Sequence, residues 1–254
     1  MIRHLLQLIW NQRKQNAWLW AELLLVSVFL WFLVDYLYVM GRTYTAPLGF
    51  DIRHTYSIVI SSLSERSPDY IPKEKRERPD GVHLLTALDR IRTYPGVESA
   101  CLTDGGMPYY MGSRNLVWRI DTLQVPCRYA FVTPEFFDVF RIYDKDGKTA
   151  SLKRAIEDNN SIVISADVET MNPGLSLLGQ KAYRGNVTDE IEETIRGISV
   201  PIRRHEYTKA EPNVYRALRL SRMEEGYYEG MIDAVRLCVR VRPDVDNADF
   251  PTRF

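Results

Sequence analysis

Cysteine is scarce in this chain, which narrows the kinds of site that its side chains can form. The three cysteines, Cys101, Cys127 and Cys238, are far apart and show no CxxC spacing. An odd and scattered set of this kind does not make a disulfide framework. We therefore expect free thiols packed inside the protein, with a bridge between two of them as the alternative. Cysteine usage alone does not identify the cellular compartment.

Histidine is also scarce, and neither sign of charge is in excess. The histidines His4, His54, His83 and His205 are widely separated, and none lies in HExxH or another metal-ligand spacing. The sequence therefore predicts no zinc site. Its 33 basic residues balance 33 acidic ones. Because proteins that bind nucleic acids usually carry a basic face, this balance argues against a nucleic-acid partner.

The sequence also lacks the motifs of enzymes. Residues 147–149, GKT, copy the end of a phosphate-binding loop, but Ile142 stands where that motif needs its first glycine. Asp144 and Asp146 would repel phosphate, so a turn is the better interpretation. There is no GxSxG elbow. We assign no catalytic, cofactor-binding or metal-binding residue, and we expect a protein that is not an enzyme.

Only one stretch is apolar enough to cross a membrane. Its charge-free part, residues 23–34, would form roughly 18 Å of helix, whereas a bilayer core of about 30 Å needs roughly twenty residues. A span must therefore include both flanks, with Glu22 and Asp35 near opposite interfaces. Tryptophans and tyrosines at both ends supply aromatic belts. We predict a transmembrane helix over residues 17–40.

Two other interpretations of this stretch are a cleaved signal peptide and a buried core helix. A signal peptide ends in a small-x-small cleavage site, but after Val34 the chain continues DYLYVMGR. The preceding residues 1–16 contain basic residues and no acid, which favours a cytoplasmic N-terminus. Apolar residues at helical spacing predict that residues 1–16 form a cytoplasmic interfacial helix: Ile2, Leu5, Leu6 and Ile9.

The remaining residues alternate between strand and helix patterns. A strand at residues 56–63, a helix at 82–91 and a strand at 97–103 predict a βαβ unit. Further strands are expected at residues 116–123, 125–133, 161–165, 197–204, 213–221 and 234–242, with a turn at 144–148 and a short helix at 151–156. The fold class is therefore α+β.

An aromatic helix is expected after the strand at residues 125–133. Thr133 is its predicted N-cap, and Pro134 suits the first helical position. Phe136, Phe137 and Phe140 form a stripe that we interpret as core, with a ligand cage as the alternative.

Two blocks of sequence, residues 129–142 and 161–180, resemble the extracytoplasmic core of MacB/FtsX-type ABC-transporter permeases. The resemblance rests on the run from Val132 to Phe137, on Ile164-Ser165 and on Leu178-Gly179. It implies a porter-like βαβ subdomain at residues 45–103 and 235–254, and an inserted strand-rich subdomain at residues 104–234.

This sequence departs from the resembled family in two places. Residues 167–171 read DVETM, where members of that family usually have a small residue, a lysine and an aromatic residue. The chain also stops where family permeases continue into further spans, so the porter-like subdomain is expected to be incomplete and the chain to be a permease fragment.

The resemblance implies a non-enzymatic protein in the bacterial inner membrane, with its main domain in the periplasm. Expected partners are a separate ABC ATPase subunit, a second permease copy or homologue, and the lipid bilayer. A periplasmic protein or an amphiphilic, peptide or lipoprotein substrate is a further expected partner. The alternative function is the ectodomain of a single-span membrane sensor.

Overall fold

The computed structural model describes residues 17–61, 63–72, 75–110, 112, 114–185, 190–226 and 232–246, together with Arg3, Gln7, Trp10 and Lys14. The chain divides into two compact units, Met1–Pro47 and Leu48–Phe254. Most of the interfacial helix predicted at residues 1–16 lies outside the described residues.

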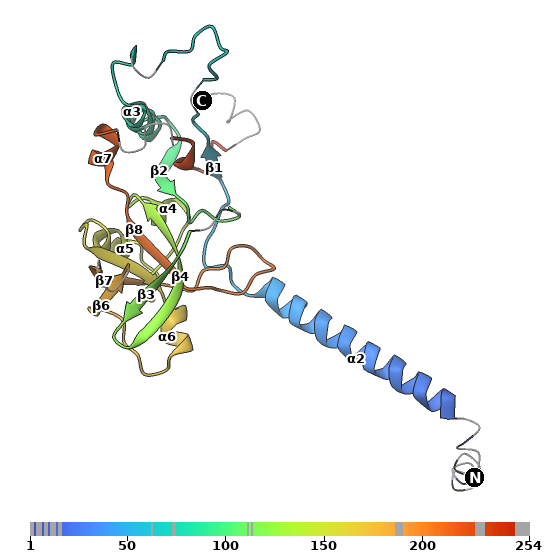
Figure 1. The fold of residues 1–254 in the computed structure, drawn as a ribbon. Coiled ribbons are helices and arrows are strands. Elements are labelled where there is room, and N and C mark those ends of the chain that lie inside the picture. The colour runs from blue at the N-terminus through green and yellow to red at the C-terminus, as the bar shows by residue number, and fades with distance from the viewer. Residues whose placement is uncertain are drawn as a thin grey trace. The chain divides into compact units, whose positions relative to one another are not determined.

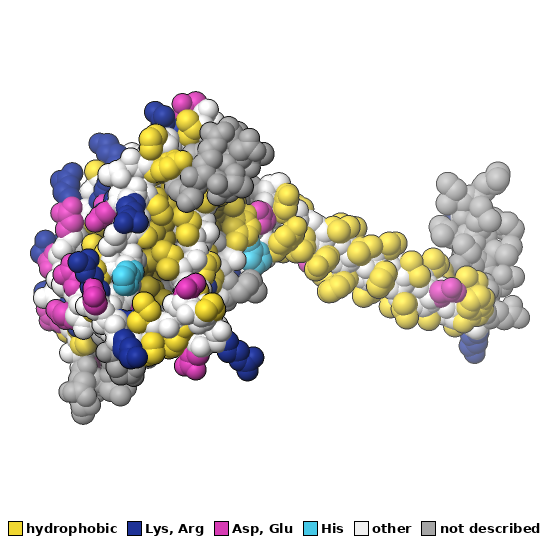
Figure 2. Space-filling model, turned by 90° about the horizontal axis from the view of Figure 1, so that it is seen from above, with side chains coloured by type: hydrophobic (Ala, Val, Ile, Leu, Met, Phe, Trp, Pro, Cys, Tyr) yellow, Lys and Arg dark blue, Asp and Glu magenta, His cyan; other side chains and the backbone are white. Residues whose placement is uncertain are grey.

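The first unit contains one long apolar helix, α2, at Ala17–Thr45. None of its residues is buried, and hydrophobic side chains cover it along its length (Figure 2). Its 29 residues extend about 44 Å at 1.5 Å per residue, which exceeds a bilayer core of about 30 Å. The helix is therefore long and apolar enough to cross a membrane. It begins at the predicted residue but continues past residue 40 to Thr45.

The second unit is built of nine strands and several short helices around them (Figure 1). The strands are β1 Thr55–Ile58, β2 Val97–Asp104, β3 Arg114–Ile120, β4 Leu123–Val132, β5 Ser161–Ser165, β6 Lys181–Arg184, β7 Ile191–Ser199, β8 Asn213–Ala217 and β9 Arg236–Val241. The helices are α3 Asp80–Arg92, α4 Phe136–Val139, α5 Ala150–Ala155, α6 Asp167–Met171, α7 Leu220–Glu224 and the 3₁₀ helix η2 Ile232–Ala234. The α+β class is confirmed.

Strand β9 lies between the two strands of the predicted βαβ unit. It pairs antiparallel with β1 and with β2, and Cys101 stands opposite Cys238 in the second pairing. Leu84 and Leu88 of α3 join the apolar residues of β2 and β9 in one buried cluster. The predicted strand, helix and strand therefore all form, but the two strands are separated by a segment from the far end of the chain.

Six strands close into a barrel in the order β4, β3, β6, β7, β5 and β8, because β8 pairs back onto β4. The β4–β8 and β5–β7 pairings are parallel, and the others are antiparallel. The barrel joins the β1-β9-β2 strands through two residue pairs between β2 and β4. The sequence predicted most of these strands but not their closure.

The aromatic helix after β4 is short and completely packed. Phe136 and Phe137 are 0% exposed and Phe140 is 2% exposed, which confirms their interpretation as core. The N-cap prediction was wrong, because α4 begins at Phe136 and Thr133 remains part of a strand junction. The Thr133 side chain accepts a hydrogen bond from the Leu102 amide at 3.1 Å, so it ties β4 to β2 instead of capping a helix.

Several predicted boundaries also differ from the structure. Strand β7 ends at Ser199, so residues 200–204 do not continue the strand predicted at 197–204. Likewise, β8 ends at Ala217, and the remainder of the predicted strand at 213–221 contributes to α7. Strand β6 has only four residues and was not predicted. All three cysteines are free and buried, as expected.

Candidate functional site

The GKT segment forms a tight turn whose backbone amides are bound by a carboxylate of the same turn. The Asp144 carboxylate accepts hydrogen bonds from the Asp146 and Lys148 amides, at 2.9 and 2.8 Å. Gly147 has φ +75°, a left-handed conformation that glycine adopts at little cost. The turn therefore satisfies its amides with its own carboxylate, which confirms the interpretation as a turn.

No group of three or more His, Cys, Asp and Glu residues suited to holding a metal occurs among the residues that the structure describes. His54 lies 2.5 Å from an Asp246 carboxylate oxygen, and the His205 ring lies 6.0 Å from that of Tyr207. These histidines therefore belong to separate local contacts of the second unit.

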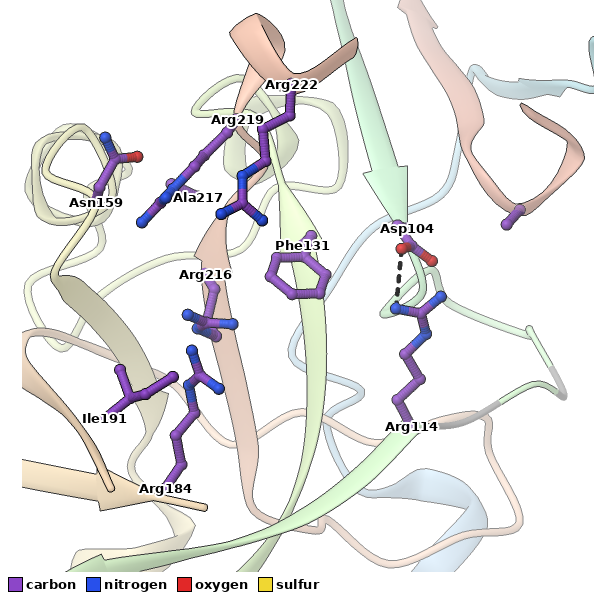
Figure 3. Close-up of a pocket in the computed structure, with 11 residues that line it drawn as sticks. Asp104, Arg114, Phe131, Asn159, Arg184, Ile191, Arg216, Ala217, Arg219 and Arg222 are labelled. Carbon is purple, nitrogen blue, oxygen red and sulfur yellow. Dashed lines mark ion pairs between the residues drawn. The ribbon is translucent and has the colours of Figure 1, made fainter. Parts of the chain in front are cut away.

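A cavity of about 520 Å³ lies in the second unit. Figure 3 shows it between the ends of several strands and the loop that carries α7. Its lining residues are Asp104, Arg114, Phe131, Asn159, Arg184, Ile191, Arg216, Ala217, Arg219, Arg222 and Ala234. We call it the arginine cavity, because five of these residues are arginines.

Strands β6 and β8 supply two of these arginines, and both meet one buried carboxylate. Glu193 of β7 is 2% exposed and accepts a hydrogen bond from Arg216 Nε at 2.7 Å. Arg184 Nε lies 3.3 Å from the same carboxylate oxygen. The indole N–H of Trp118 donates to the other oxygen at 3.3 Å. Glu193 therefore holds both guanidinium groups at one end of the cavity.

Arg216 is further positioned by an aromatic ring. Its guanidinium carbon lies 5.0 Å from the centroid of the Phe131 ring, within cation–π distance. Burial lowers the pKa of Arg216, and the neighbouring Glu193 charge opposes that shift. The guanidinium remains protonated at neutral pH, because arginine titrates far above it. The Arg216 guanidinium therefore carries its positive charge in a largely buried environment.

The opposite side of the cavity carries a second ion pair. Arg114 Nη1, at the start of β3, lies 3.0 Å from Asp104 Oδ2, at the end of β2. The pair lacks hydrogen-bond geometry, so Oδ2 accepts no hydrogen bond from the described part of the chain. Burial raises the pKa of Asp104, and the Arg114 charge opposes the shift.

The segment after β8 places the other two arginines over the cavity. Arg219 precedes α7 and Arg222 lies within it. Figure 3 shows Arg222 directed toward the space beside Phe131 and Arg219 directed toward the side of Asn159. The Arg219 guanidinium has no carboxylate partner among the residues described. Five arginines and two carboxylates, those of Asp104 and Glu193, therefore lie at this site.

The arginine cavity continues into two smaller cavities, because each shares lining residues with it. One of about 400 Å³ shares Asn159, Ala217 and Arg219. The other, of about 210 Å³, shares Asp104, Arg114 and Ala234. The concave surface therefore extends beyond the arginines on both sides.

Sequence reasoning assigned no site residue and missed these arginines. One signal was present, because Arg216, Arg219 and Arg222 recur at intervals of three residues. The other charged residues of the site come from distant segments, namely Asp104, Arg114, Arg184 and Glu193. Only the barrel closure that places β8 between β4 and β5 brings them together.

No protein-family model matches the chain, and no curated protein matches it. Among solved structures, a domain of a protein assigned as a permease from Porphyromonas gingivalis is 20% identical, with a TM-score of 0.46. That match covers 66% of this chain and 65% of that domain's chain.

Two further similar structures are the periplasmic region of MacB and the extracellular domain of YknZ. The periplasmic region of MacB from Actinobacillus actinomycetemcomitans is 10% identical, with a TM-score of 0.46, over 84% of this chain and 85% of its own. The extracellular domain of YknZ, a noncanonic ABC-type transporter from Gram-positive bacteria, is 12% identical, with a TM-score of 0.45. That match covers 78% of this chain and 87% of the YknZ chain.

Proposed function

We propose that this chain is an extracytoplasmic domain of an ABC-transporter permease, held at the membrane by its first span. The supporting observation is the direct succession of a candidate span, α2, and an α+β unit that begins at Leu48. The basic, acid-free residues 1–16 support a cytoplasmic N-terminus, since positive residues favour that side. The second unit then lies outside the cytoplasm.

The two blocks of family resemblance supply the main support for the permease assignment. Their strands, β4 and β5, both pair with β8, so the blocks lie on either side of one barrel strand. Phe136 and Phe137 of the first block pack against Tyr215 of β8. In the second block, the Gly179 amide donates to the Ile195 carbonyl at 2.8 Å. The resemblance thus concerns residues that organise the core of the domain.

The same proposal divides residues 45–254 as the resemblance implies. Residues 45–103 and 235–254 form the porter-like part, and residues 104–234 form the inserted part. The arrangement of β1, β9 and β2 with α3 supports the first, and the closed barrel supports the second.

A permease of this kind acts mechanically and carries no catalytic residue of its own. A separate ATPase in the cytoplasm moves α2 and neighbouring spans, and the outer domain follows. ATP binding changes events outside only if the two states differ in their contacts, so subunit packing with a second permease copy or homologue must have two arrangements. Proposed consequences are export of an amphiphile, peptide or lipoprotein, or regulation of a periplasmic protein.

Capture of the chain from native membranes tests the partnership with an ATPase. We expect a tagged chain, solubilised in mild detergent, to retain an ATPase subunit that carries both nucleotide-binding motifs. A matched control replaces residues 17–40 by an unrelated apolar helix of equal length, which should anchor the domain but lose the ATPase. Retention of a signalling protein and no ATPase, unchanged by this replacement, would favour a single-span sensor.

A further inference from the structure

The charge of the arginine cavity exceeds what the fold uses for its own ion pairs. Glu193 pairs with Arg184 and Arg216, and Asp104 pairs with Arg114. Arg219 has no carboxylate among the described residues, although it lines the same space. Concentrated charge of one sign destabilises a compact state through self-repulsion. A bound anion would offset that repulsion, whereas an empty cavity leaves it in place.

Two polar groups in the cavity wall have unused hydrogen-bonding capacity. Arg184 Nε is buried and donates no hydrogen bond to the described residues, because its approach to Glu193 lacks the required geometry. Arg114 is 43% exposed on its side chain and meets Asp104 without a hydrogen bond, so it retains donors for a ligand. Buried polar groups without partners are uncommon in folded proteins. The exposed donors of Arg114, unlike the buried Nε of Arg184, are therefore accessible to an acceptor-rich ligand.

Arginine also specifies the chemistry of the ligand. Its planar guanidinium presents donors in a fork that matches the oxygens of phosphate and carboxylate groups. Figure 3 shows the guanidinium groups of Arg184, Arg216 and Arg222 on one side of Phe131, that of Arg219 beyond them toward Asn159, and that of Arg114 on the other side of the ring. Several forks around one space suit an anion with more than one negative charge. The Phe131 ring adds an apolar surface.

We propose that the arginine cavity binds a phosphate group or a compound that carries one. The same chemistry occurs in soluble phosphate compounds and in the headgroups of anionic phospholipids. A volume of about 520 Å³ lies within the range of ordinary small-molecule sites. The adjoining cavities give room for a larger molecule whose phosphate occupies the arginines.

Binding to the full chain in phosphatidylcholine nanodiscs tests this proposal. Inorganic pyrophosphate is titrated at low ionic strength by calorimetry, and we expect saturable binding that weakens as salt is added. Arg219→Gln should weaken binding roughly tenfold or more, the loss expected for one charge-assisted hydrogen bond. The affinity of Arg219→Lys should lie between those of the unaltered chain and of Arg219→Gln, because lysine retains the charge but not the forked donors.

Two further variants separate a specific site from general charge attraction. Arg114→Gln, on the opposite wall, should also weaken binding, and it provides the same comparison if Arg219→Gln fails to fold. Arg90→Gln removes an equal charge from the exposed face of α3, outside the three cavities, and should leave the affinity within about twofold. Absence of binding both by pyrophosphate and by the phosphatidic acid described below, or equal losses in all three variants, overturns the proposal.

The source of the phosphate is separated by a second titration. Dihexanoylphosphatidic acid is compared with pyrophosphate, and dihexanoylphosphatidylcholine serves as the zwitterionic control. Tighter binding of phosphatidic acid identifies a lipid headgroup as the ligand, and tighter binding of pyrophosphate identifies a soluble phosphate compound. Failure of either ligand to bind would not affect the capture of an ATPase, so this proposal and the permease proposal fail independently.

Discussion

Truncation of Phe136 should destabilise the second unit strongly, because this ring is completely buried among other aromatic rings. Its centroid lies 4.8 Å from that of Phe140, 5.5 Å from that of Tyr215 and 5.9 Å from that of Phe137. Replacing a buried phenylalanine by alanine costs about 3–5 kcal/mol through lost transfer energy and the cavity left behind. The three aromatic contacts favour the upper part of that range, since each pair adds about 0.5–1.5 kcal/mol.

The assay is thermal unfolding of a soluble fragment that spans residues 48–254. For a domain of about 200 residues, 1 kcal/mol shifts the midpoint by roughly 2–4 °C, so Phe136→Ala should lower it by about 6–20 °C. Phe137→Ala should behave similarly, because that ring is also fully buried. Phe136→Leu should cost less, since most of the volume remains filled.

An exposed aromatic residue provides the matched control. Tyr207 is 60% exposed, and Tyr207→Ala should change stability by only about 0.5 kcal/mol. Near-neutral results for Phe136→Ala, Phe137→Ala and Phe140→Ala together would refute the assignment of these residues to the core. They would instead indicate an exposed aromatic surface for a ligand or partner.

Three other predictions follow from buried charges, buried thiols and the GKT turn. Glu193→Gln should lower the free energy of unfolding, measured with denaturant, by about 3–5 kcal/mol, because it leaves two guanidinium groups without their buried carboxylate. The control Glu192→Gln removes an exposed ion pair and should lower it by less than about 1 kcal/mol. The three buried thiols should resist an aromatic disulfide reagent in the folded protein and react when the protein unfolds. Thiolate is the reactive form, and burial raises the pKa of Cys127 to about 12, so this thiol stays protonated in the folded protein. The chain should not hydrolyse ATP, and any ATP affinity should survive Lys148→Ala but weaken with Arg219→Gln.

Each of these predictions has a clear contrary result. Equal losses for the two glutamate variants would mean that the Glu193 pairs do not support the barrel. Rapid labelling of a thiol in the folded state would mean that at least one cysteine is accessible. Loss of ATP affinity on Lys148→Ala would mean that the turn at residues 144–148 binds phosphate after all.

Local sequence patterns predicted most elements of the second unit but not their arrangement. The apolar spacing of α3 and the β-branched run of β5 are visible in short windows, because burial imposes a period on them. The pairing of β8 with both β4 and β5 joins segments far apart in sequence and includes a parallel contact. No local pattern specifies such a pairing, so barrel closure could not be predicted.

The arginine cavity shows the same limit at the level of side chains. Its residues come from β2, β3, β4, β6, β7 and β8, from the segment around α7, from η2 and from the loop before β5. Thr133 failed as a predicted N-cap for a related reason. Its local sequence suits a helix start, but its hydroxyl oxygen is used by the Leu102 amide of a neighbouring strand. Tertiary contacts thus decided both cases.

The membrane orientation of the chain is the most direct test of its proposed role as an extracytoplasmic domain. An N-terminally tagged chain in intact spheroplasts is treated with protease, and a cytoplasmic protein serves as the control for intact membranes. We predict that residues 44–254 are digested while a small tagged remnant containing the preceding residues of α2 is protected. Full protection of residues 44–254 until the spheroplasts are lysed would contradict the proposed orientation.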